Sequence, residues 1–479
     1  MKIPDSWHGD WRGLNALVLG LGKSGFSVVD TLVELGVKTA VVGDHANQEL
    51  IDLTELIGSK FLPSTEISVL NEIGFKPDFV VVSPGFSPNH PLVKELEKLG
   101  TPLMGDIDLA FRLRDKNQKE AKWVTVTGTN GKTTVSELTA TILVTAGFRA
   151  VACGNIGTPI LDIIRDPVDY DFLVVEISSF QLHYLGVIAP VVSAYLNIAQ
   201  DHLDWHGSFD EYAKAKAKVF LGTETAIIFN EQDQLTLNAA RAAEVQDGCR
   251  AISFGLAAPQ VSSVGYIEDL LVDRAFLDDR GNQAIELCEI QDIEQISAIS
   301  SQLLANCAAA AAITRALGVE PRKIKESFRE FKLSPHRNQF LAEVNGVRFI
   351  NDSKATNAHA AKGSLESLDS VVWVLGGLLK GVDPEPMILA NSQKIRAAVL
   401  LGSETGELEG LFEKHLPDVP VVICGKEEPM RDAIEHSFRL AKSGDTVLLA
   451  PMAASMDQFV DYADRGDQFI AAVRKLEQQ

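Results

Sequence analysis

The sequence predicts an α/β protein of three domains, each built on a mainly parallel sheet. Its 479 residues are too many for one hydrophobic core, since domains hold about 150 residues each. Apolar strands alternate with helical stretches along the whole chain, which is typical of parallel sheets. Two breaks, the polar run 112–122 and the stretch Leu333-Ser-Pro335, divide the chain into domains at 1–112, 113–333 and 334–479.

Each domain repeats the strand–helix pattern. In the first we expect a helix after the first strand, and strands at 16–20, 39–44 and 78–83. In the second we expect two closing helices at 302–317 and 321–331, after strands at 122–127, 171–176, 191–196 and 226–230. In the third we expect a hairpin at Asn345-Gly346, then strands at 371–375, 397–401, 421–424 and 446–450.

Composition excludes several classes of partner. The net charge of -21, without a cluster of basic residues, argues against nucleic acid and acidic membranes as partners. The five cysteines form no C-x-x-C pair, which favours free, buried thiols in a reducing compartment. We see no signal peptide and no apolar run of about 18 residues, the length that a membrane span needs. We therefore expect a cytoplasmic protein.

A glycine-rich turn follows the first strand. Gly20, Gly22 and Gly25 have the spacing of a dinucleotide-binding turn, and Asp44 follows at the end of the next strand. An NAD enzyme is therefore one hypothesis. The broader one is a nucleotide diphosphate on the helix N-terminus, with Ser24 adding a hydroxyl. A purely structural turn is the third.

A stronger phosphate-binding signal opens the second domain. The strand 122–127 runs into Gly128-Thr-Asn-Gly-Lys-Thr-Thr134 and then into a helix at 135–146. In such a loop, backbone N–H groups surround phosphate oxygens, Lys132 reaches the β- and γ-phosphates, and the hydroxyl of Thr133 binds Mg²⁺. Val126 stands where the general motif has its first glycine, but the strand–loop–helix context supports the assignment.

Metal ligands are expected near this loop. Glu176 ends the strand 171–176 and is placed to hold Mg²⁺, although a solvated strand end is also common. His202 and His206 lie four residues apart, as in some zinc sites, but the segment looks loop-like. A single His202 near the phosphates is the simpler hypothesis. In the helix 212–218, lysines two residues apart cannot share one face, so Lys216 is distinguished from its solvated neighbours.

Polar loops also follow the strands of the third domain. They include Pro335-His-Arg337, Asn351-Asp-Ser-Lys-Ala-Thr-Asn357, Gly376-Gly-Leu-Leu-Lys380 and the run 451–459. In open α/β sheets ligands bind at the carboxyl ends of strands, so a shared polar site is favoured over a set of plain turns.

Together these motifs resemble the Mur ligases. The phosphate loop, Gly154-Asn-Ile-Gly157, Glu176, Asp201-His202, Pro335-His-Arg337, the loop 351–357 and Ser455 with Arg465-Gly466 occur in the family order. The Gly20–Gly25 turn, Ser83-Pro-Gly85 and the run 455–466 resemble the branch that adds D-glutamate. The resemblance covers essentially the whole chain.

The resemblance implies a Rossmann-like domain for the UDP-linked substrate, a central P-loop ATPase domain and a Rossmann-like D-glutamate domain. It implies that UDP-N-acetylmuramoyl-L-alanine, D-glutamate and ATP give the D-glutamyl product, ADP and phosphate through an acyl phosphate. ATP, Mg²⁺ at two sites and a carbamylated Lys216 are the implied cofactors, and a monomer is expected.

The resemblance also implies roles for single residues. The catalytic set is Lys132, Glu176, His202 and Lys216, and the metal ligands are Thr133, Glu176, His202 and Lys216. The ATP contacts are Gly128, Thr129, Asn130, Gly131, Lys132, Thr133, Thr134, Asn306, Arg337 and Asp352. The substrate contacts are Ser24, Asp44, His45, Ser83, Gly85 and Asn155 for the UDP-linked donor, and Lys354, Thr356, Lys380, Ser455 and Tyr462 for D-glutamate.

Three other functions stay open from the sequence. An NAD-dependent oxidoreductase would use the Gly20 turn but leaves the Gly128–Thr134 loop without a role. A folylpolyglutamate-type ligase would share that loop but needs no UDP pocket. A non-catalytic UDP-sugar sensor would bind its ligand and hydrolyse nothing.

Overall fold

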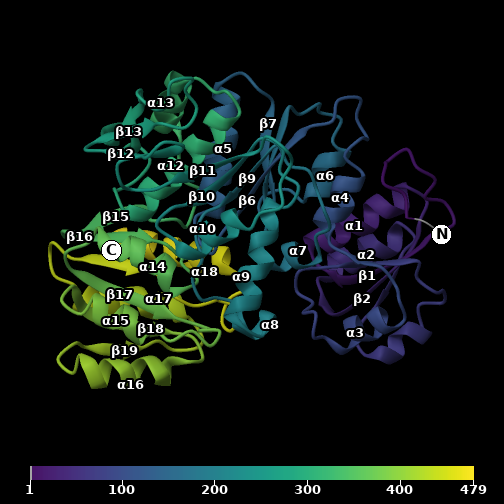
Figure 1. Ribbon diagram of the computed structural model, residues 1–479. Helices are drawn as coiled ribbons and strands as arrows, with labels where there is room; N and C mark the ends of the chain where they lie inside the picture. Colours follow the sequence, from purple (N-terminus) through teal and green to yellow (C-terminus); the bar gives the residue numbers. More distant parts are fainter. Residues whose placement is uncertain (1–2, 479) are drawn as a thin grey trace. The chain divides into compact units, whose positions relative to one another are not determined.

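The computed structural model describes residues 3–478 and contains three mainly parallel sheets with helices around them, which confirms the predicted α/β class (Figure 1). The chain forms two compact units. Unit 1 comprises the chain to Ile198, then Trp205–Ile290 and Asn306–Phe328. Unit 2 comprises Ala199–Asp204, Gln291–Ala305 and the chain from Arg329.

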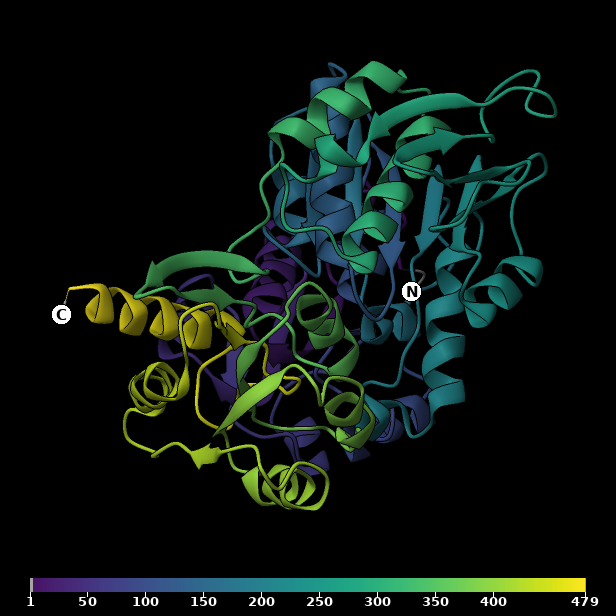
Figure 2. The ribbon, with the colours of Figure 1, turned by 90° about the vertical axis from the view of Figure 1, so that its left-hand side faces the viewer.

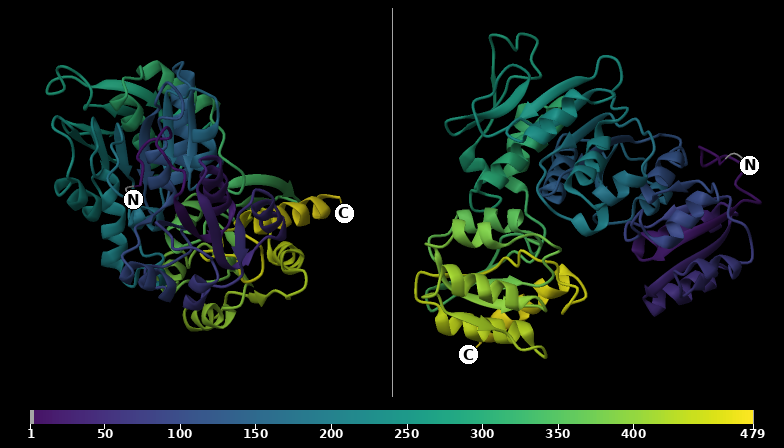
Figure 3. Two further views of the ribbon diagram at one scale, coloured as in Figure 1. Left: turned by 90° about the vertical axis from the view of Figure 1, so that its right-hand side faces the viewer. Right: turned by 60° about the horizontal axis from the view of Figure 1, so that its bottom comes forward.

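The first sheet belongs to unit 1 and is entirely parallel, in the order β3-β2-β1-β4-β5. Its strands are β1 Asn15–Leu21, β2 Lys38–Ala46, β3 Lys60–Leu62, β4 Phe79–Val82 and β5 Leu103–Met104. Its helices are α1 Lys23–Glu34, α2 Gln48–Leu56, α3 Pro91–Lys98 and α4 Asp106–Arg112. Side chains of α1 and α4 pack on one face and those of α3 on the other. Helices therefore cover both faces of this sheet (Figure 3).

The second sheet, also in unit 1, has nine strands in the order β14-β13-β12-β11-β10-β9-β6-β8-β7. Its parallel strands are β6 Lys122–Thr127, β7 Ala150–Gly154, β8 Phe172–Glu176, β9 Val192–Tyr195, β10 Ala226–Asn230 and β11 Arg250–Phe254. The sheet continues through β12 Ser263–Ile267 to the antiparallel β13 Leu270–Asp273 and β14 Ile285–Glu289.

Nine helices are described between residues 132 and 330. They are α5 Lys132–Thr145, α6 Ile160–Arg165, α7 Ser179–Tyr184, α8 Leu203–His206, α9 Phe209–Ala217, α10 Gln234–Arg241, α11 Ile290–Ile293, α12 Ser301–Ala316 and α13 Pro321–Glu330. The segment 201–206, expected to be a loop, contains one helical turn at its end, so that expectation was wrong in part. Helix α5 also begins at Lys132, three residues earlier than expected.

One hydrophobic core cluster of unit 1 is shared by its two sheets. A single cluster joins Val28 of α1 and Ile107 of α4 to Ile163 of α6 and to Leu173 of the second sheet. At its edge the guanidinium of Arg165 on α6 forms ion pairs with Asp30 and Glu34 of α1. Because burial excludes water across this contact, the first and second sheets form one body.

The third sheet lies in unit 2, in the order β15-β16-β20-β17-β18-β19. Its strands are β15 Gln339–Val344, β16 Val347–Asn351, β17 Val371–Gly376, β18 Ile395–Leu401, β19 Val421–Ile423 and β20 Thr446–Leu449. The hairpin at Asn345-Gly346 is confirmed, and β15 is antiparallel to β16. Its helices are α14 Ala358–Glu366, α15 Glu385–Ala390, α16 Thr405–His415, α17 Pro429–Leu440 and α18 Tyr462–Glu477.

Helices cover both faces of this third sheet. Side chains of α14, α15 and α16 pack on one face, and those of α17 and α18 pack on the other. Figure 2 shows the yellow helix α18 lying beside the green hairpin of β15 and β16. The sheet therefore presents its strand ends and the loops after them as the exposed binding edge. Within residues 3–478, no helix has both the length and the apolar character needed to cross a membrane.

Candidate active site

The loop Gly128–Thr134 connects β6 to α5 in unit 1. Gly131 caps the helix with φ +82°, a left-handed conformation that other residues adopt only at a cost. A Cβ at this position would lie 2.2 Å from Asn306 Oδ1, so the Asn306 side chain packs directly against the loop. The loop amides therefore face the start of α5, where helix geometry favours anions.

Two lysines converge on one carbonyl of this loop. Lys132 Nζ donates hydrogen bonds of 2.9 Å to the carbonyl oxygens of Gly128 and Thr129. Lys216 Nζ donates a bond of 2.7 Å to the same Gly128 oxygen, and its side chain is only 1% exposed. Lys214 and Lys218 are exposed, as the spacing on the helix predicts. Lys216 is thus the one lysine of this helix that reaches the loop.

Glu176 ends β8 beside the first turn of α5. Thr133 Oγ1 donates a hydrogen bond of 2.8 Å to its Oε2, and Asn155 Nδ2 donates one of 2.8 Å to its Oε1. A carboxylate and a hydroxyl suit Mg²⁺, which commonly takes few protein ligands and completes its shell with phosphate and water. Within residues 3–478, no three His, Cys, Asp or Glu side chains cluster as a complete metal site. The donor set therefore fits a cation shared with a phosphate ligand.

Two residues that the sequence did not single out also hold the loop. Asn197 Oδ1 accepts a hydrogen bond of 2.9 Å from the Asn130 amide, and Thr129 Oγ1 lies 2.9 Å from Tyr212 Oη. Asn197 follows β9, which lies next to β6 in the sheet. Its place after a strand was a usable signal, but the neighbouring order of the strands was not visible in the sequence.

His206 lies in an aromatic cluster close to these residues. Its ring stacks on Phe180 at 5.6 Å between centroids, and Nε2 is 2.9 Å from Ser179 Oγ. Burial is the main cause that lowers the pKa of His206 to about 4, and the nearby His183 and Lys216 act in the same direction. The imidazole is therefore neutral at neutral pH.

The glycine turn of the first sheet is tightly packed. A Cβ at Gly25 would lie 2.1 Å from the Gly20 carbonyl oxygen, and Ser83 Oγ donates to that same oxygen at 3.2 Å. Helix α1 begins at Lys23 without a side-chain cap. Because the first N–H groups of an uncapped helix lack intrahelical partners, they can bind phosphate oxygens.

The remaining residues predicted for the donor lie around this turn. The side chain of Ser24 is in the first turn of α1, and Gly85 follows Ser83 on the loop after β4. Asp44 and His45 are exposed near the end of β2, and both oxygens of Asp44 lie 2.7 Å from Thr65 Oγ1. The structure thus gathers these residues at the carboxyl ends of adjacent parallel strands.

In unit 2, Arg337 and Asp352 lie at the start of the third sheet. The Asp352 carboxylate accepts hydrogen bonds from the Asn338 amide at 3.2 Å and from the Ser364 hydroxyl. Burial raises the pKa of Asp352 above its ordinary value. Arg337 lines a cavity of about 300 Å³ together with Lys332 and Arg348, and no acidic residue of the described chain lines it.

The residues predicted for D-glutamate lie on the loops after β16, β17 and β20 of unit 2. Lys354 Nζ stands 3.6 Å from the ring centre of Tyr462, a cation–π contact. Thr356 follows on the same loop, while Ser455 is buried on the loop after β20. Lys380 has φ +56°, and its Nζ lies 3.5 Å from Asp201 Oδ1.

Asp201 is a further polar residue of unit 2, for which the sequence predicted no contact with substrate, ATP or metal. Asn357 Nδ2 donates to its Oδ2 at 3.1 Å, and the His202 amide donates to its Oδ1 at 2.9 Å. His202 has φ +53° and belongs to unit 2, whereas His206 belongs to unit 1. Asp201 therefore orients the backbone that presents His202.

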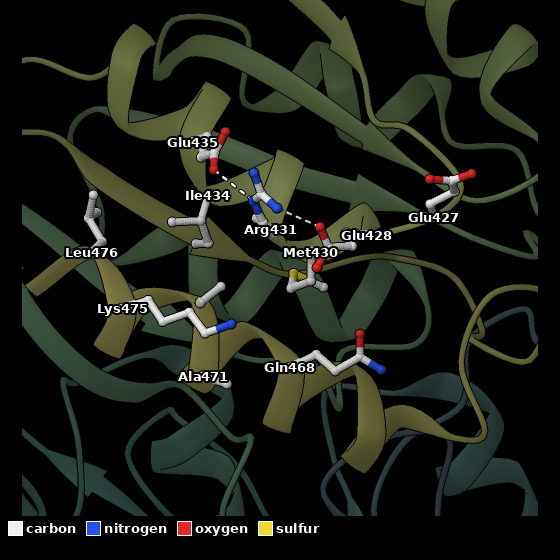
Figure 4. A pocket seen from close by; sticks show the side chains of 11 residues that line it. Glu427, Glu428, Met430, Arg431, Ile434, Glu435, Gln468, Ala471, Lys475 and Leu476 are labelled. Atoms are coloured by element: carbon white, nitrogen blue, oxygen red, sulfur yellow. Dashed lines mark hydrogen bonds and ion pairs between the residues drawn. The ribbon is translucent and has the colours of Figure 1, made fainter. Parts of the chain in front are cut away.

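A groove outside these sites lies between α17 and α18. It is lined by Met430 and Ile434 at its base, and Arg431 at its rim pairs with Glu428 and Glu435 (Figure 4). None of the predicted site residues lines this groove. The groove is therefore separate from the arrangement described above.

Three family descriptions match successive parts of the chain. They are "Mur ligase MurD-like, N-terminal domain" at residues 14–105, "Mur ligase middle domain" at 126–314 and "Mur ligase, glutamate ligase domain" at 336–453. Each match lies on one of the three sheets, in the same order.

Two curated relatives match almost the whole chain. The UDP-N-acetylmuramoylalanine–D-glutamate ligase of Leifsonia xyli is 46% identical, covering 98% of this chain and 94% of that protein. The enzyme of the same name from Streptomyces coelicolor is 40% identical, covering 98% and 99%. Among solved structures, UDP-N-acetylmuramate-alanine ligase MurC of Thermotoga maritima shares the fold, with a TM-score of 0.58 at 14% identity over 96% of this chain and 99% of that one.

Proposed function

The chain belongs to the Mur ligase family, and on this premise we propose how its residues divide the work of one reaction. It is an ATP-dependent ligase that joins D-glutamate to UDP-N-acetylmuramoyl-L-alanine in the synthesis of peptidoglycan precursors. The observation that carries this assignment is the 46% identity that runs through 98% of the chain, with all three domains present in order.

The reaction proceeds through an acyl phosphate. A carboxylate is a poor electrophile at neutral pH, so an oxygen of the alanyl carboxylate first attacks the γ-phosphorus of ATP and ADP leaves. The amine of D-glutamate then attacks the carbonyl carbon, a tetrahedral intermediate forms, and phosphate leaves as the amide bond closes. The protein supplies position and charge rather than covalent chemistry.

For ATP, we propose that the amides and hydroxyls of the Gly128–Thr134 loop surround the phosphates. Lys132 would turn from the Gly128 and Thr129 carbonyls, which it binds in this structure, toward the γ-phosphate. Asn306 packs against the same loop and would contact the nucleotide there. In unit 2, Arg337 and Asp352 would contact the rest of the nucleotide through their charge and hydrogen-bonding groups.

ATP and Mg²⁺ are the cofactors of the family. We propose that Thr133 and Glu176 hold one Mg²⁺, since their oxygens already face each other. When bound, the cation neutralises charge on the phosphates. We propose Lys216, as a carbamate, and His202 as ligands of a second Mg²⁺. Carbamate formation would need the neutral amine, and the burial of the Lys216 side chain acts in that direction.

For the two substrates, the loops at the strand ends suit the chemistry. We propose that domain 1–112 binds the UDP moiety through Ser24, Asp44, His45, Ser83 and Gly85, with Asn155 of domain 113–333 nearer the sugar. We propose that domain 334–479 binds D-glutamate through the cationic and hydroxyl groups of Lys354, Thr356, Lys380 and Ser455, beside Tyr462.

We further propose that the enzyme acts as a monomer in the cytoplasm. The five free cysteines, four of them buried, suit a reducing compartment. The negative net charge of -21 suits a protein that does not bind acidic membranes.

Phosphate release from ATP with UDP-N-acetylmuramoyl-L-alanine tests the assignment, with D-glutamate, L-glutamate and L-lysine compared as acceptors. We expect turnover with D-glutamate and little with the other two, and the nucleotide product should be ADP. Turnover that does not depend on D-glutamate would overturn the assignment. Tight NADH binding without ATP turnover would instead support an oxidoreductase.

A further inference from the structure

Arg465 in the first turn of α18 is one of the largest fully buried side chains of the protein. It is 1% exposed, and its described hydrogen bonds go to the uncharged groups of Ser353 and Ala453. Burial lowers the pKa of Arg465 to about 9, with only the more distant charge of Asp457 acting against the shift. Burying an unpaired charge destabilises a folded protein, so an apolar residue would pack here at lower cost.

The guanidinium joins two loops of unit 2. Its Nη2 and Nε donate to Ser353, to the carbonyl oxygen at 2.8 Å and to the hydroxyl at 3.0 Å. Its Nη1 donates to the Ala453 carbonyl oxygen at 3.1 Å. Ser353 lies on the loop after β16 and Ala453 on the loop after β20, so one planar side chain spans the ends of two adjacent strands.

Further bonds connect the same loops to α18. The Ser353 hydroxyl donates to the Tyr462 carbonyl oxygen at 2.7 Å. The Met452 amide donates to the Ala355 carbonyl oxygen at 3.0 Å. The network therefore fixes the backbone of the residues that flank Lys354, Thr356 and Ser455, while Arg465 itself is shielded from any ligand by its burial.

We propose that Arg465 is a positioning residue for the acceptor amino acid, holding the Lys354–Thr356 loop and the Ser455 loop at a fixed separation. This inference rests on the proposed function of those loops in binding D-glutamate. The requirement for three directed N–H donors explains why a costly guanidinium stands at this position. An ammonium group has one nitrogen and cannot reach both loops with the same geometry.

Arg465→Lys tests the proposal, because it keeps the positive charge and removes the planar set of N–H donors. We expect the KM for D-glutamate to rise about tenfold, with kcat and the KM for ATP changed by about twofold or less, since a small displacement weakens the acceptor contacts alone. Arg474→Lys is the matched chemical control, an exposed arginine on the same helix. Phe469→Leu is the control for stability, since it loosens the packing of α18 and leaves the hydrogen bonds of Arg465 in place.

A readout that needs no activity accompanies the kinetics. Amide hydrogen exchange of Ala355 and Met452 should be faster in Arg465→Lys and unchanged in Arg474→Lys, because their bonds lie within the two loops. Should Arg465→Lys fail to fold, Ser353→Ala decides in its place, since it removes the hydroxyl that links Arg465 to Tyr462.

The proposed function and the positioning role of Arg465 can fail independently of each other. A wild-type enzyme without D-glutamate-dependent turnover overturns the proposed function, whereas exchange still reports whether Arg465 holds the loops. A D-glutamate KM that Phe469→Leu raises as much as Arg465→Lys overturns the positioning role. An unchanged KM in both Arg465→Lys and Ser353→Ala overturns it as well.

Discussion

Thr133 and Glu176 are joined by a hydrogen bond of 2.8 Å between the first turn of α5 and the last residue of β8. Asn155 donates a hydrogen bond to the other oxygen of Glu176, and the side chain is buried. Both oxygens of the carboxylate are therefore held in place. We propose that the Thr133 and Glu176 side chains would hold a Mg²⁺ ion through their oxygens, in place of the hydrogen bond that joins them here.

Glu176→Gln should weaken Mg²⁺ binding, because the amide has lost the negative charge that attracts the cation. We expect the Mg²⁺ concentration for half-maximal activity to rise about tenfold or more. Thr133→Val should act in the same direction, and Thr133→Ser, which keeps the hydroxyl, is its control. A Mg²⁺ dependence that is unaltered in Glu176→Gln would show that the cation binds elsewhere.

Lys216→Ala should lower kcat by about two orders of magnitude, the scale on which loss of one charge-stabilising group acts. Short carboxylic acids such as formate should restore part of the activity, because a carboxylate in the vacated space supplies the oxygens of the proposed carbamate. The measurement is phosphate release with and without formate. Lys214→Ala, on the exposed face of the same helix, should behave as the wild type. Full activity of Lys216→Ala without additives would exclude the role.

Gly131→Ala should destabilise the protein and weaken ATP binding. The left-handed backbone costs about 1–2 kcal/mol for alanine, and the new methyl group also collides with Asn306 Oδ1. Gly147→Ala is the matched control, since Gly147 follows the same helix with φ +94° and has nothing within 4 Å of an added Cβ. Gly131→Ala should therefore lose more thermal stability and more ATP affinity than Gly147→Ala, as measured by thermal unfolding and ATP titration. Equal losses in the two variants would show that the collision with Asn306 has no effect.

The free energy of unfolding should fall as the pH drops from 6.5 toward 4. Burial lowers the pKa of His206 to about 4, whereas in the unfolded chain it is 6.5, so protons bind preferentially to the unfolded state in this range. The slope from this group is at most about 1.4 kcal/mol per pH unit. His206→Gln should flatten the dependence measured by urea unfolding, and His8→Gln, at an exposed site, should leave it unchanged. Equal slopes in all three proteins would contradict the assignment.

The sequence was informative where local pattern determines structure. The strand 122–127 and the glycine loop after it could be located to the residue, because a buried parallel strand is a continuous apolar run and the loop motif has fixed spacing. Lys216 could be separated from Lys214 because side chains two positions apart on a helix point in different directions. Its burial in the structure agrees with that separation.

The sequence did not predict the features whose structure depends on long-range packing. The strands β11 to β14 were not predicted, because they are short and carry Gly, Ser and acidic residues, and each is stabilised by pairing with its neighbour in the sheet. Asn197 contacts the Gly128–Thr134 loop because β9 lies beside β6, and Tyr212 of α9 contacts it from 83 positions away. Arg465 would be placed on the surface by composition alone, since its burial depends on two loops, one of them 112 positions away in the sequence.

The first two sheets share a hydrophobic core cluster, and Arg165 forms ion pairs with Asp30 and Glu34 at its edge. These contacts hold the two sheets at a set distance from each other. If uridine diphosphate binds after β1 and ATP binds after β6, as we propose, the shared core sets the distance between the two nucleotides, and a donor of matching length would bring its carboxylate to the γ-phosphate. The length of the donor would then decide whether it is selected, before any amino acid binds.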